Sequence, residues 1–566
     1  MRSRIQQLCF LFSVWIYFTF FGKFHLLFTE GMQLFLFTRD YAADTCMQPG
    51  GTANYLSRFI VQFFHFPWLG ALIIAFMLLA LQFLVQKVAS EKPGEHSGLS
   101  YIPSFFYLCL LADLTKYTIT GLVSLLAALT AVLAYKHIRN TGYRALWGFI
   151  SLPLLWYTMG GVAVLAALLM IVTELARKEQ RRFLPLLAVI TVGLTTVFAA
   201  PRIAPSLSDP ALFYGANYLR FIEQWDLVLP TLWIATALVI ICLKLVPSVQ
   251  KQGYAVLVSV LIFLTRYFSL WRIHDTGRED ILRCYFSIHK GHWNEVISRA
   301  RKKMPVDVLT INGLNLALAA TNQAGDCMFA FPQSPQTLSV FNTGEGLLFS
   351  AETLFNLGFI NEAQRLSHEY MESAPDRQLS ALLLAQMAET NLIAGRTAVA
   401  EKYLRLLEQT LFYKKAARGI MPLTRDPQLV RAHPFYGPLR KYQPAGNFSS
   451  DFSNLDNMLA RMITEHPDNK MAVNYFFMYL MLHKNSEALH NLFPAVAPVP
   501  RHYQELIAWM QTMEPDNYPR YKDVTIDASV KTELNLLLSQ IRRGNNSPAS
   551  LGPQYAHTYW FYLLFM

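Results

Sequence analysis

Two acidic residues and an arginine lie together shortly after the first long apolar run of the chain. Residues 38–44 read TRDYAAD and contain Arg39, Asp40 and Asp44. A carboxylate in this position can act as a general base on an acceptor hydroxyl, and a guanidinium can hold a phosphate group. Short acidic segments are also commonly solvated or cap a helix. Asp40 and Asp44 are therefore candidate catalytic residues, with capping or solvation as the alternative.

Further ionisable residues are scattered through the apolar half, where they could line a polar cavity. Such side chains are costly at membrane depth and commonly mark a cavity or pathway that binds polar groups, including lipid phosphates. The alternative is that they extend to the lipid headgroups, with Asp113 and Lys116 pairing across one turn. The candidates for a cavity or lipid-phosphate site are Lys23, Arg39, His65, Asp113, Lys116, Arg202 and Arg266.

Other chemistry is not indicated by the sequence. There is no Gly-rich phosphate loop, nucleophile elbow, HExxH motif or paired CxxC motif. His289 and His292 flank Gly291 without a third ligand nearby, which favours surface histidines over a metal site. Cys284 and Cys327 could form a disulfide in an oxidising compartment, or remain free. We expect no metal and no cofactor.

Composition and charge indicate a protein that spans a lipid bilayer. The chain has 566 residues, of which 53% are hydrophobic and 15% charged, against about 25% charged in ordinary soluble domains. Its net charge is +11, of which residues 1–275 carry +9 and the remainder +2. Basic residues concentrated in the apolar half report membrane topology better than phosphate binding. We therefore expect contact with lipid and no nucleic-acid partner.

Apolar runs in residues 1–275 predict a bundle of about nine transmembrane helices. A span needs about 20 apolar residues of helix. Two long stretches, 103–137 and 145–176, contain polar or glycine breaks and are each divided in two, either as full hairpins or as re-entrant segments. The predicted spans are 8–28, 59–86, 103–115, 118–137, 145–158, 160–176, 184–200, 228–247 and 253–272.

The distribution of basic residues predicts the orientation of these spans. Lys136 and Arg144 precede the stretch 145–176, and Arg177 follows it. Both flanks should be cytoplasmic, so the stretch crosses an even number of times and turns at Gly160-Gly161. The prediction is a bacterial cytoplasmic (inner) membrane protein with a cytoplasmic N-terminus and an extracytoplasmic (periplasmic) C-terminal domain, residues 276–566.

The C-terminal half contains segments with the lettering of helix–turn–helix repeats. A turn residue is followed by a small or apolar residue that lets the second helix pack closely, and a proline closes the clearest unit. The positions in this pattern are Gly291, Gly358, Ala363, Gly395, Ala400, Asn485 and Ala488, with Asn485 replacing glycine in the fourth copy. These segments resemble the tetratricopeptide family, most closely over Glu345–Arg405.

That resemblance implies an all-α chain in which the membrane bundle is followed by an α-solenoid of tetratricopeptide-like hairpins. It also implies a groove for a protein or peptide partner. The spacing departs from the family between Gly395 and Asn485, where an irregular stretch contains four prolines. The alternative is a stack of helical hairpins with no partner in its groove.

Two further resemblances concern the whole chain. Its layout is similar to that of membrane glycosyltransferases that use polyprenyl-phosphate sugars, in which an acidic residue follows the first span. Residues 48–51, QPGG, and Pro67-Trp68-Leu69-Gly70 are more distinctive. These segments resemble a family of bacterial multi-pass membrane proteins whose domain is of unknown function.

The sequence therefore predicts an interaction or assembly factor of the cell envelope whose helical-repeat domain binds a protein or peptide. The alternative is a polyprenyl-phosphate-sugar-dependent membrane glycosyltransferase with an extracytoplasmic active site. In that case Asp40 or Asp44 would be the base, with the basic candidates above as phosphate contacts.

Overall fold

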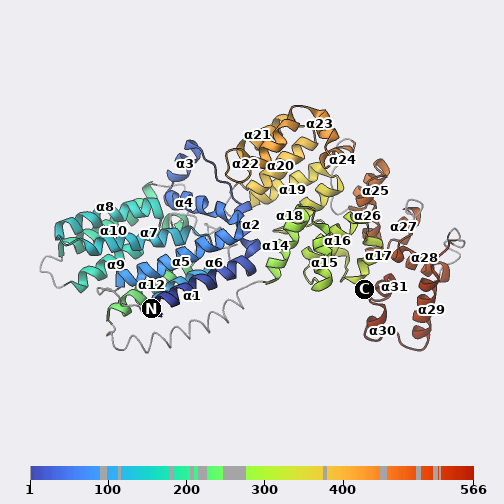
Figure 1. Cartoon of the computed structure of the whole chain (residues 1–566), viewed down its shortest axis with the longest axis horizontal. Coiled ribbons are helices and arrows are strands. Elements are labelled where there is room, and N and C mark those ends of the chain that lie inside the picture. Colours follow the sequence, from blue (N-terminus) through green and yellow to red (C-terminus); the bar gives the residue numbers. More distant parts are fainter. Residues whose placement is uncertain are drawn as a thin grey trace. The chain divides into compact units, whose positions relative to one another are not determined.

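The structure is a computed structural model of the full chain (Figure 1). It describes residues 2–89, 98–112, 117–177, 183–203, 209–214, 226–245, 276–373, 379–445, 455–492, 499–513, 521 and 524–566. Within these residues every regular element is a helix and none is a strand. The predicted all-α class is confirmed at this level.

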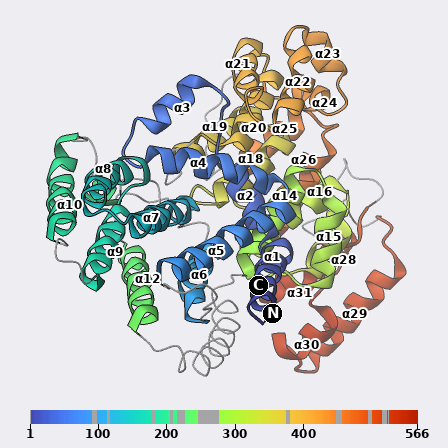
Figure 2. The ribbon, with the colours of Figure 1, turned by 60° about the vertical axis from the view of Figure 1, so that its left-hand side comes forward.

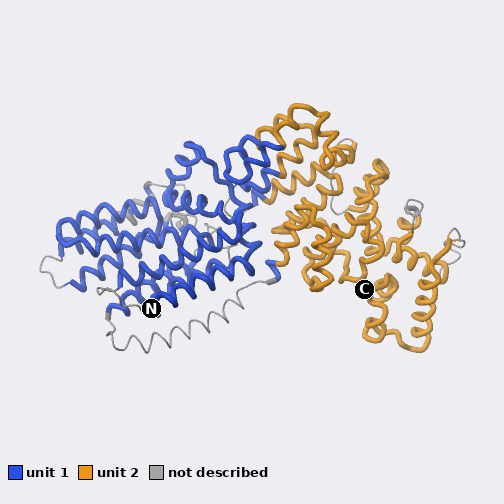
Figure 3. Tube along the Cα trace, viewed as in Figure 1, with its two compact units in different colours: residues 1–279, 371–385, 404–419 blue, residues 280–370, 386–403, 420–566 orange. Residues whose placement is uncertain are grey.

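The chain divides into two compact units, shown in separate colours in Figure 3. Unit 1 comprises residues 1–279, 371–385 and 404–419, and unit 2 comprises residues 280–370, 386–403 and 420–566. Unit 1 thus contains the apolar half together with two short segments from the later part of the chain.

Unit 1 is built around α5 (Pro67–Ala89), a long and almost wholly apolar helix. It packs against α1 (Arg2–Ile16), α6 (Ile102–Leu111), α7 (Thr120–His137) and α12 (Val228–Leu245), as can be followed in Figure 2. One face of α5 is fully buried. That face is formed by Ile74, Leu78, Leu81 and Val85, spaced as one side of a helix requires.

The stretch 145–176 forms two helices that turn at the predicted glycines. Helices α8 (Thr141–Met159) and α9 (Ala163–Ala176) pack against each other and against α10 (Phe183–Ile203). Gly160 has φ 83° and ψ −156°, a backbone conformation essentially restricted to glycine. A Cβ on Gly161 would lie 2.2 Å from the carbonyl oxygen of Phe213, so this turn requires both glycines.

The basic residues that flank this hairpin meet at one end of the bundle. Arg144 Nε lies 2.8 Å from Glu174 Oε1, and both side chains are buried. Arg144 Nη1 also donates to the carbonyls of Ile138 and Arg139, which follow α7. Arg177 Nη2 donates to the carbonyl of Lys136, so the ends of α7, α8 and α9 are held together by guanidinium groups.

The predicted spans and the observed helices differ mainly at the first two. Instead of a single helix over 8–28, α1 is followed by a π-helical turn, Tyr17–Phe21, and by α2 (Lys23–Gly31) after a break at Gly22. Residues 59–66 complete α4 (Gly51–Val61) and a 3₁₀ turn, and the long helix begins only at Pro67.

Three helices in the described residues are long and apolar enough to cross a membrane. They comprise Arg4–Phe21, Pro67–Ala89 and Thr120–His137. Several of the other predicted spans correspond to shorter apolar helices, and the predicted span 253–272 lies outside the described residues.

Unit 2 contains helices joined by a recurring tight turn. At each turn one residue has a positive φ, and the next N–H donates to the carbonyl five residues before it, which satisfies an otherwise unpaired helix carbonyl. The left-handed residues are Gly291, Asn322, Gly358, Gly395, Lys484 and Gly544. The N–H donors and their acceptors are His292 to Ser287, Gln323 to Leu318, Phe359 to Leu354, Arg396 to Asn391, Asn485 to Leu480, and Asn545 to Gln540.

Four of these turns join the helix pairs that the sequence predicts. The pairs are α14 (Thr276–His289) with α15 (Trp293–Lys302), α18 (Gly346–Leu357) with α19 (Ile360–Ser373), α20 (Ala381–Ile393) with α21 (Thr397–Leu407), and α26 (Lys470–Leu482) with α27 (Ser486–Leu492). Ala363 and Ala400 are fully buried, as close packing of the second helix requires.

The fourth turn differs by one residue from its prediction. Lys484 has φ 52°, so it takes the left-handed position assigned to Asn485. Asn485 instead accepts a hydrogen bond from Ala488 N through its side chain and begins α27. Leu489, five residues after Lys484, occupies the buried position, and Ala488 is half-buried.

The centre of unit 2 consists of helices that are buried on all sides. Helix α16 (Val308–Ala320) is buried from Ile311 to Ala319, and α18 is buried from Gly346 to Phe355. Helix α26 packs against both. A helix that is apolar around its circumference belongs in a core. Helices α16 and α18 therefore present no open face to a partner.

The six cysteines all lie within described residues, and all six are free. Cys284 is buried, and its thiol faces the carbonyl of Thr310 at 3.7 Å. Cys284 and Cys327 thus do not form the disulfide that the sequence left open.

Candidate functional site

The acidic residues predicted as catalytic lie on an exposed helix. Helix α3 (Arg39–Cys46) contains Arg39, Asp40 and Asp44, and all three side chains are exposed. Thr38 caps its N-terminus by accepting from Tyr41 N. Asp40 lies in the first turn, where a carboxylate is stabilised by the helix dipole. No ion pair among the described side chains involves Asp40 or Asp44, so the geometry favours the solvated alternative.

The predicted cavity residues that the structure describes do not form one cluster. Lys23 is exposed at the start of α2, with Nζ 5.2 Å from the ring centre of Phe24. Arg202 is exposed in the last turn of α10. His65 alone joins a cluster, which is described below. Asp113, Lys116 and Arg266 lie outside the described residues.

A buried carboxylate holds the start of α2 within unit 1. Glu279 accepts from the backbone N–H of Phe24 at 2.8 Å and from that of His25 at 3.2 Å. Its Oε2 is also 2.6 Å from His25 Nδ1. Glu279 thus satisfies two unpaired helix N–H groups and the imidazole together. Its burial is tolerated because every contact is a hydrogen bond to a donor.

A second carboxylate lies at the other end of the same helix. Glu30 is buried and accepts from the Tyr413 hydroxyl at 3.1 Å, and its Oε2 is 3.5 Å from His65 Nδ1. The His65 ring stacks on Phe412, with centroids 4.8 Å apart and planes 5° from parallel. Burial and the charge of Glu30 raise the pKa of Tyr413 well above its ordinary value, so the phenol remains protonated and keeps donating.

The segments of the later chain that belong to unit 1 are held to residues 31–37 through the backbone. Ser380 Oγ donates to the carbonyl of Gly31, Ala381 N to that of Gln33, and Phe37 N to that of Gln409. Helix α2 and the extended residues that follow it therefore lie between segments far away in the sequence.

Aromatic rings cluster around Phe35, and the half-buried Arg58 forms a hydrogen bond with one of them. Phe35 packs edge-on or tilted against Tyr41, Tyr55 and Phe59, with ring centroids 5.0–5.7 Å apart. Arg58 Nη1 donates to the Tyr41 hydroxyl at 3.1 Å. No ion pair of Arg58 occurs in the described part of the chain. The hydroxyl of Tyr41 is thus a polar partner of this guanidinium, and the same tyrosine ring packs on Phe35.

Unit 2 contains its own buried polar row, which joins the helices of successive turns. His289 Nδ1 on α14 lies 2.6 Å from Glu352 Oε1 on α18. Gln386 on α20 donates to the same oxygen at 3.3 Å and accepts from Ser367 Oγ of α19 at 2.9 Å. The row fixes the rotation of each helix relative to the next, because a rotation would leave a buried polar group without its hydrogen-bond partner and so cost free energy.

The row continues to a second carboxylate, Glu389, which accepts from the Tyr436 hydroxyl at 2.9 Å. Burial raises the pKa of Glu389, and the nearby charge of Glu352 adds to this, while His289 and Tyr436 act in the opposite direction. Burial lowers the pKa of His289, but the charge and hydrogen bond of Glu352 outweigh it, so the net direction is upward. Glu352 thus stabilises the protonated form of His289, whereas burial and Glu352 disfavour the ionised form of Glu389.

Sequence reasoning missed most of the residues that form these clusters. Glu30 and Glu279 are isolated acids in the sequence, and their partners are as far as 383 and 255 positions away. Glu352 and Glu389 occur within apolar helices, where a charged residue signals a buried partner. That placement is the one signal that could have identified them.

A comparison with known protein families finds a match over the whole chain. Residues 1–566 match the model described as "Family of unknown function (DUF6057)". The chain belongs to this family. Searches of curated proteins and of solved structures find no match. The DUF6057 match agrees with the resemblance of residues 48–51 and 67–70 to an uncharacterised family, and it contributes no activity.

The turn that carries part of this resemblance is well defined in the DUF6057 chain. Gly50 has φ 74°, and its N–H donates to the carbonyl of Tyr157 at 2.7 Å. The Tyr157 hydroxyl returns a hydrogen bond to the carbonyl of Met47. These hydrogen bonds hold the start of α4 against the end of α8, so the turn at Pro49-Gly50-Gly51 has a role in helix packing.

Proposed function

We propose that this DUF6057 protein is a membrane-bound interaction or assembly factor whose C-terminal helix pairs bind a protein or peptide partner. The observation that carries the proposal is the recurrence of one turn. Left-handed residues at Gly291, Asn322, Gly358 and Gly395 are 31, 36 and 37 positions apart. Spacing of this order is typical of helical repeats such as the tetratricopeptide unit, and such stacks serve mainly as binding surfaces.

The ionisable clusters support a binding role over a catalytic one. Each buried carboxylate in the clusters above accepts hydrogen bonds from backbone, histidine, amide or tyrosine groups of the chain itself. Such arrangements stabilise helix packing. The glycosyltransferase alternative has less support, because Asp40 and Asp44 are exposed and contact no basic side chain in the described structure.

Membrane insertion, multi-pass topology and a cell-envelope location are part of the same proposal. Large apolar side chains project outward along the helices of unit 1, and Phe76, Phe149, Leu187 and Leu194 are each more than half exposed. Patches of this kind are rare on proteins surrounded by water and are usual on surfaces that contact lipid.

Site-specific crosslinking in native membranes tests the proposal. A photoreactive phenylalanine is placed at Ser298 on α15, Arg365 on α19 or Val399 on α21, all exposed positions on second helices. The matched control is placed at Phe149 on α8. We expect the same crosslinked protein from at least one second-helix position in repeated preparations, and none from the control. Absence of any reproducible product from all three positions, in protein that retains its thermal unfolding transition, would overturn the proposal.

A further inference from the structure

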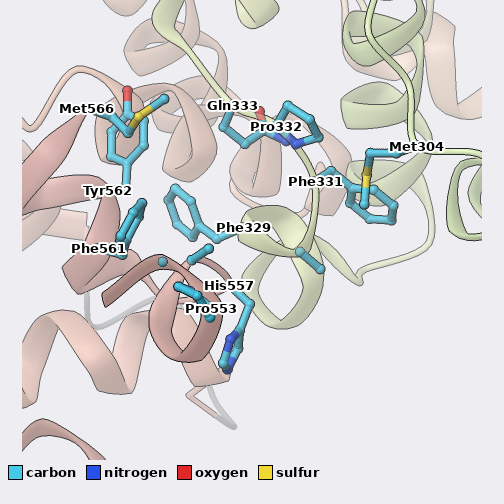
Figure 4. A pocket seen from close by; sticks show the side chains of 13 residues that line it. Met304, Phe329, Phe331, Pro332, Gln333, Pro553, His557, Phe561, Tyr562 and Met566 are labelled. Carbon is cyan, nitrogen blue, oxygen red and sulfur yellow. The ribbon is translucent and has the colours of Figure 1, made fainter. Parts of the chain in front are cut away.

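A pocket of about 460 Å³ lies in the C-terminal part of unit 2. Figure 4 shows side chains converging on it from η4 (Met328–Ala330) and the segment after it, from α30 (Pro548–Tyr555) and from α31 (Tyr559–Phe565). The volume is within the range of about 300–1,000 Å³ that is usual for ligand sites.

The floor of the pocket is aromatic and rigid. Phe329, Phe331 and Tyr562 are each at most 6% exposed. The Phe329 ring lies 5.3 Å from the ring of Tyr562 and 4.9 Å from that of His502. Buried aromatic floors of this type accept apolar anchor side chains at protein interfaces.

The rim is apolar and adaptable. Met304 is 51% exposed and Met566 is 68% exposed, and the two lie on different sides of the opening in Figure 4. Methionine is flexible and polarisable, so it adjusts to ligands of differing shape. Val306, two residues beyond Met304, is 92% exposed. These side chains leave apolar surface accessible beside the pocket.

Gln333 is the buried polar side chain in the lining, and its amide group already forms hydrogen bonds within the chain. Gln333 donates to Asn315 Oδ1 at 3.0 Å and to the carbonyl of Met328 at 3.1 Å. Its oxygen accepts from Asn315 Nδ2 and from the Thr337 hydroxyl. A small polar metabolite would need directional partners, which this floor does not offer. The pocket suits an apolar group.

Three basic side chains lie close to the segments that line the pocket. Arg301 and Lys302 are exposed and immediately precede the segment that carries Met304, and Lys484 Nζ lies 5.7 Å from the Tyr562 ring centre. None of the three forms an ion pair within the described residues. The nearby carboxylate of Glu533 is already paired with Arg501 and lies 3.7 Å from His557. A partner with acidic residues complements this rim.

We propose that this pocket binds an acidic peptide segment of a partner protein by taking up one or two of its bulky apolar side chains. The proposal rests on the binding function proposed above and identifies where and what the chain binds. Helices α16 and α18 are covered by the chain itself, which closes an inner groove along these two helices, whereas this pocket is an apolar concavity with exposed side chains in its lining. A lipid surface fits less well, because the buried rings of Phe329, Phe331 and Tyr562 form a concave floor, which a single inserted side chain fills better than a bilayer surface does.

Selection from a display library of random 12-residue peptides tests the proposal with full-length protein in nanodiscs. One selection uses the wild type and the other uses Ala556→Trp, which fills the pocket from an exposed lining position. The matched control is Ala549→Trp, which makes the same substitution at an exposed position of α30 outside the lining. Equal thermal unfolding midpoints for the three proteins show that each is folded.

We expect peptides enriched on the wild type to combine large apolar residues with Asp or Glu. Their affinity should fall at least tenfold on Ala556→Trp and remain unchanged on Ala549→Trp. Replacing the apolar anchors by serine should abolish binding, and Lys302→Glu should weaken it severalfold at low ionic strength.

Several outcomes would overturn the proposal. One is the absence of sequences enriched on the wild type over Ala556→Trp, and another is enrichment of basic or wholly polar peptides. Binding to phosphatidylglycerol vesicles that Ala556→Trp abolishes, without any selected peptide, would make the pocket a lipid contact. If crosslinking from second-helix positions still captures the same protein on Ala556→Trp, the pocket proposal fails while the binding function stands.

Discussion

Glu279 shows how a carboxylate can be buried in this protein against helix N–H groups and a histidine. It accepts from two backbone N–H groups at the start of α2 and from the His25 imidazole, all at 3.2 Å or less. Hydrogen bonds to an ionised acceptor are stronger than those between neutral groups, and loss of one partner leaves the others unsatisfied. The side chain therefore contributes to stability as a helix cap.

Glu279→Gln keeps the shape of this side chain but removes its charge, so one amide oxygen must replace two carboxylate oxygens. We expect destabilisation of about 2 kcal/mol, measured as a drop in the thermal unfolding midpoint. The control is Glu295→Gln, where the carboxylate is 54% exposed and 3.6 Å from an exposed His292. Exposed pairs contribute about 0–1 kcal/mol, so this variant should unfold close to wild type. Equal losses in both variants would contradict the capping role.

Glu389 should make unit 2 less stable as the pH rises. Burial holds its pKa above 4.5 in the folded chain, so the folded state binds the proton more tightly than the unfolded state. The stability from this proton is fully present below pH 4.5 and is lost as the pH rises through the folded pKa. Glu389→Gln mimics the protonated acid and retains an acceptor for Tyr436. We expect it to match wild type near pH 4 and to become relatively more stable at higher pH.

Thermal unfolding of both proteins between pH 4 and pH 8 measures this difference directly. Glu369→Gln provides a control, because Glu369 is 43% exposed and pairs with Arg365 on the surface. Its difference from wild type should change little with pH. A Glu389→Gln variant that loses stability relative to wild type as the pH rises would contradict the direction of the pKa shift.

Helix turns in unit 2 depend on residues that accept a left-handed backbone. Gly358 has φ 101°, and a Cβ there would lie 3.0 Å from the Cβ and 3.1 Å from the carbonyl oxygen of Tyr442. Gly358→Ala therefore adds both backbone strain and a contact that backbone atoms cannot relieve. We expect destabilisation of about 1–3 kcal/mol, seen in thermal unfolding and in faster proteolysis.

Gly419→Ala is the matched control for that substitution. Gly419 lies within α22 (Lys414–Ile420), without a positive φ and with no atom within 4 Å of its added Cβ. Alanine is the better helix former by about 1 kcal/mol, so this variant should be neutral or slightly stabilised. If Gly358→Ala proved as stable as Gly419→Ala, the strained turn would not limit stability.

Because of the ion pair between α8 and α9, we expect substitutions of its two residues to have non-additive effects on the free energy of unfolding. Arg144 and Glu174 are at most 1% exposed, and Arg144 also holds two carbonyls after α7. Arg144→Met leaves the buried carboxylate of Glu174 with weaker partners, the Arg177 guanidinium at 3.9 Å and the Tyr135 hydroxyl. We expect a loss of about 3–5 kcal/mol for that variant and a smaller loss for Arg144→Met with Glu174→Leu. Additive losses in detergent unfolding would show that the two side chains are not coupled.

Elements that depend on residues close together in the sequence could be predicted. Elements that depend on contacts between residues far apart in the sequence could not. Gly291, Gly358 and Gly395 were identifiable because glycine is the usual residue of a left-handed helix end. Asn322 and Lys484 take the same conformation without that signal. The break at Gly22 lies inside an apolar run, where composition resembles one continuous helix.

The candidate sites were harder to predict than the helices. Asp40 and Asp44 attracted attention because they lie near Arg39, but proximity in sequence does not create a cavity around them. The partners of Glu30 come from residues 65 and 413, and such pairing is decided by tertiary packing. The aromatic pocket combines residues around 330 with residues around 560, which no spacing rule would bring together.

At the scale of the whole molecule, the uneven charge is the feature that predicts orientation. Residues 1–275 carry +9 of the net +11, and the two predicted basic flanks, Lys136 and Arg144 before the stretch 145–176 and Arg177 after it, meet at one end of the bundle. Basic ends of this kind remain in the cytoplasm during insertion. The turn at Gly160-Gly161 joins the other ends of α8 and α9 and should face the opposite side.

Reporter fusions test this orientation in cells. A phosphatase that is active only outside the cytoplasm should be active when fused after Asp275 and inactive when fused after Asn140, with a cytoplasmic fluorescent reporter giving the reverse pattern. The prediction depends on an odd number of crossings between these two points. Substituting Lys136, Arg139 and Arg177 by Gln should reduce the contrast, since these groups provide the bias that holds this end inside. Phosphatase activity at both fusion points would require an even number of crossings, and it would place unit 2 and the basic end on the same side of the membrane.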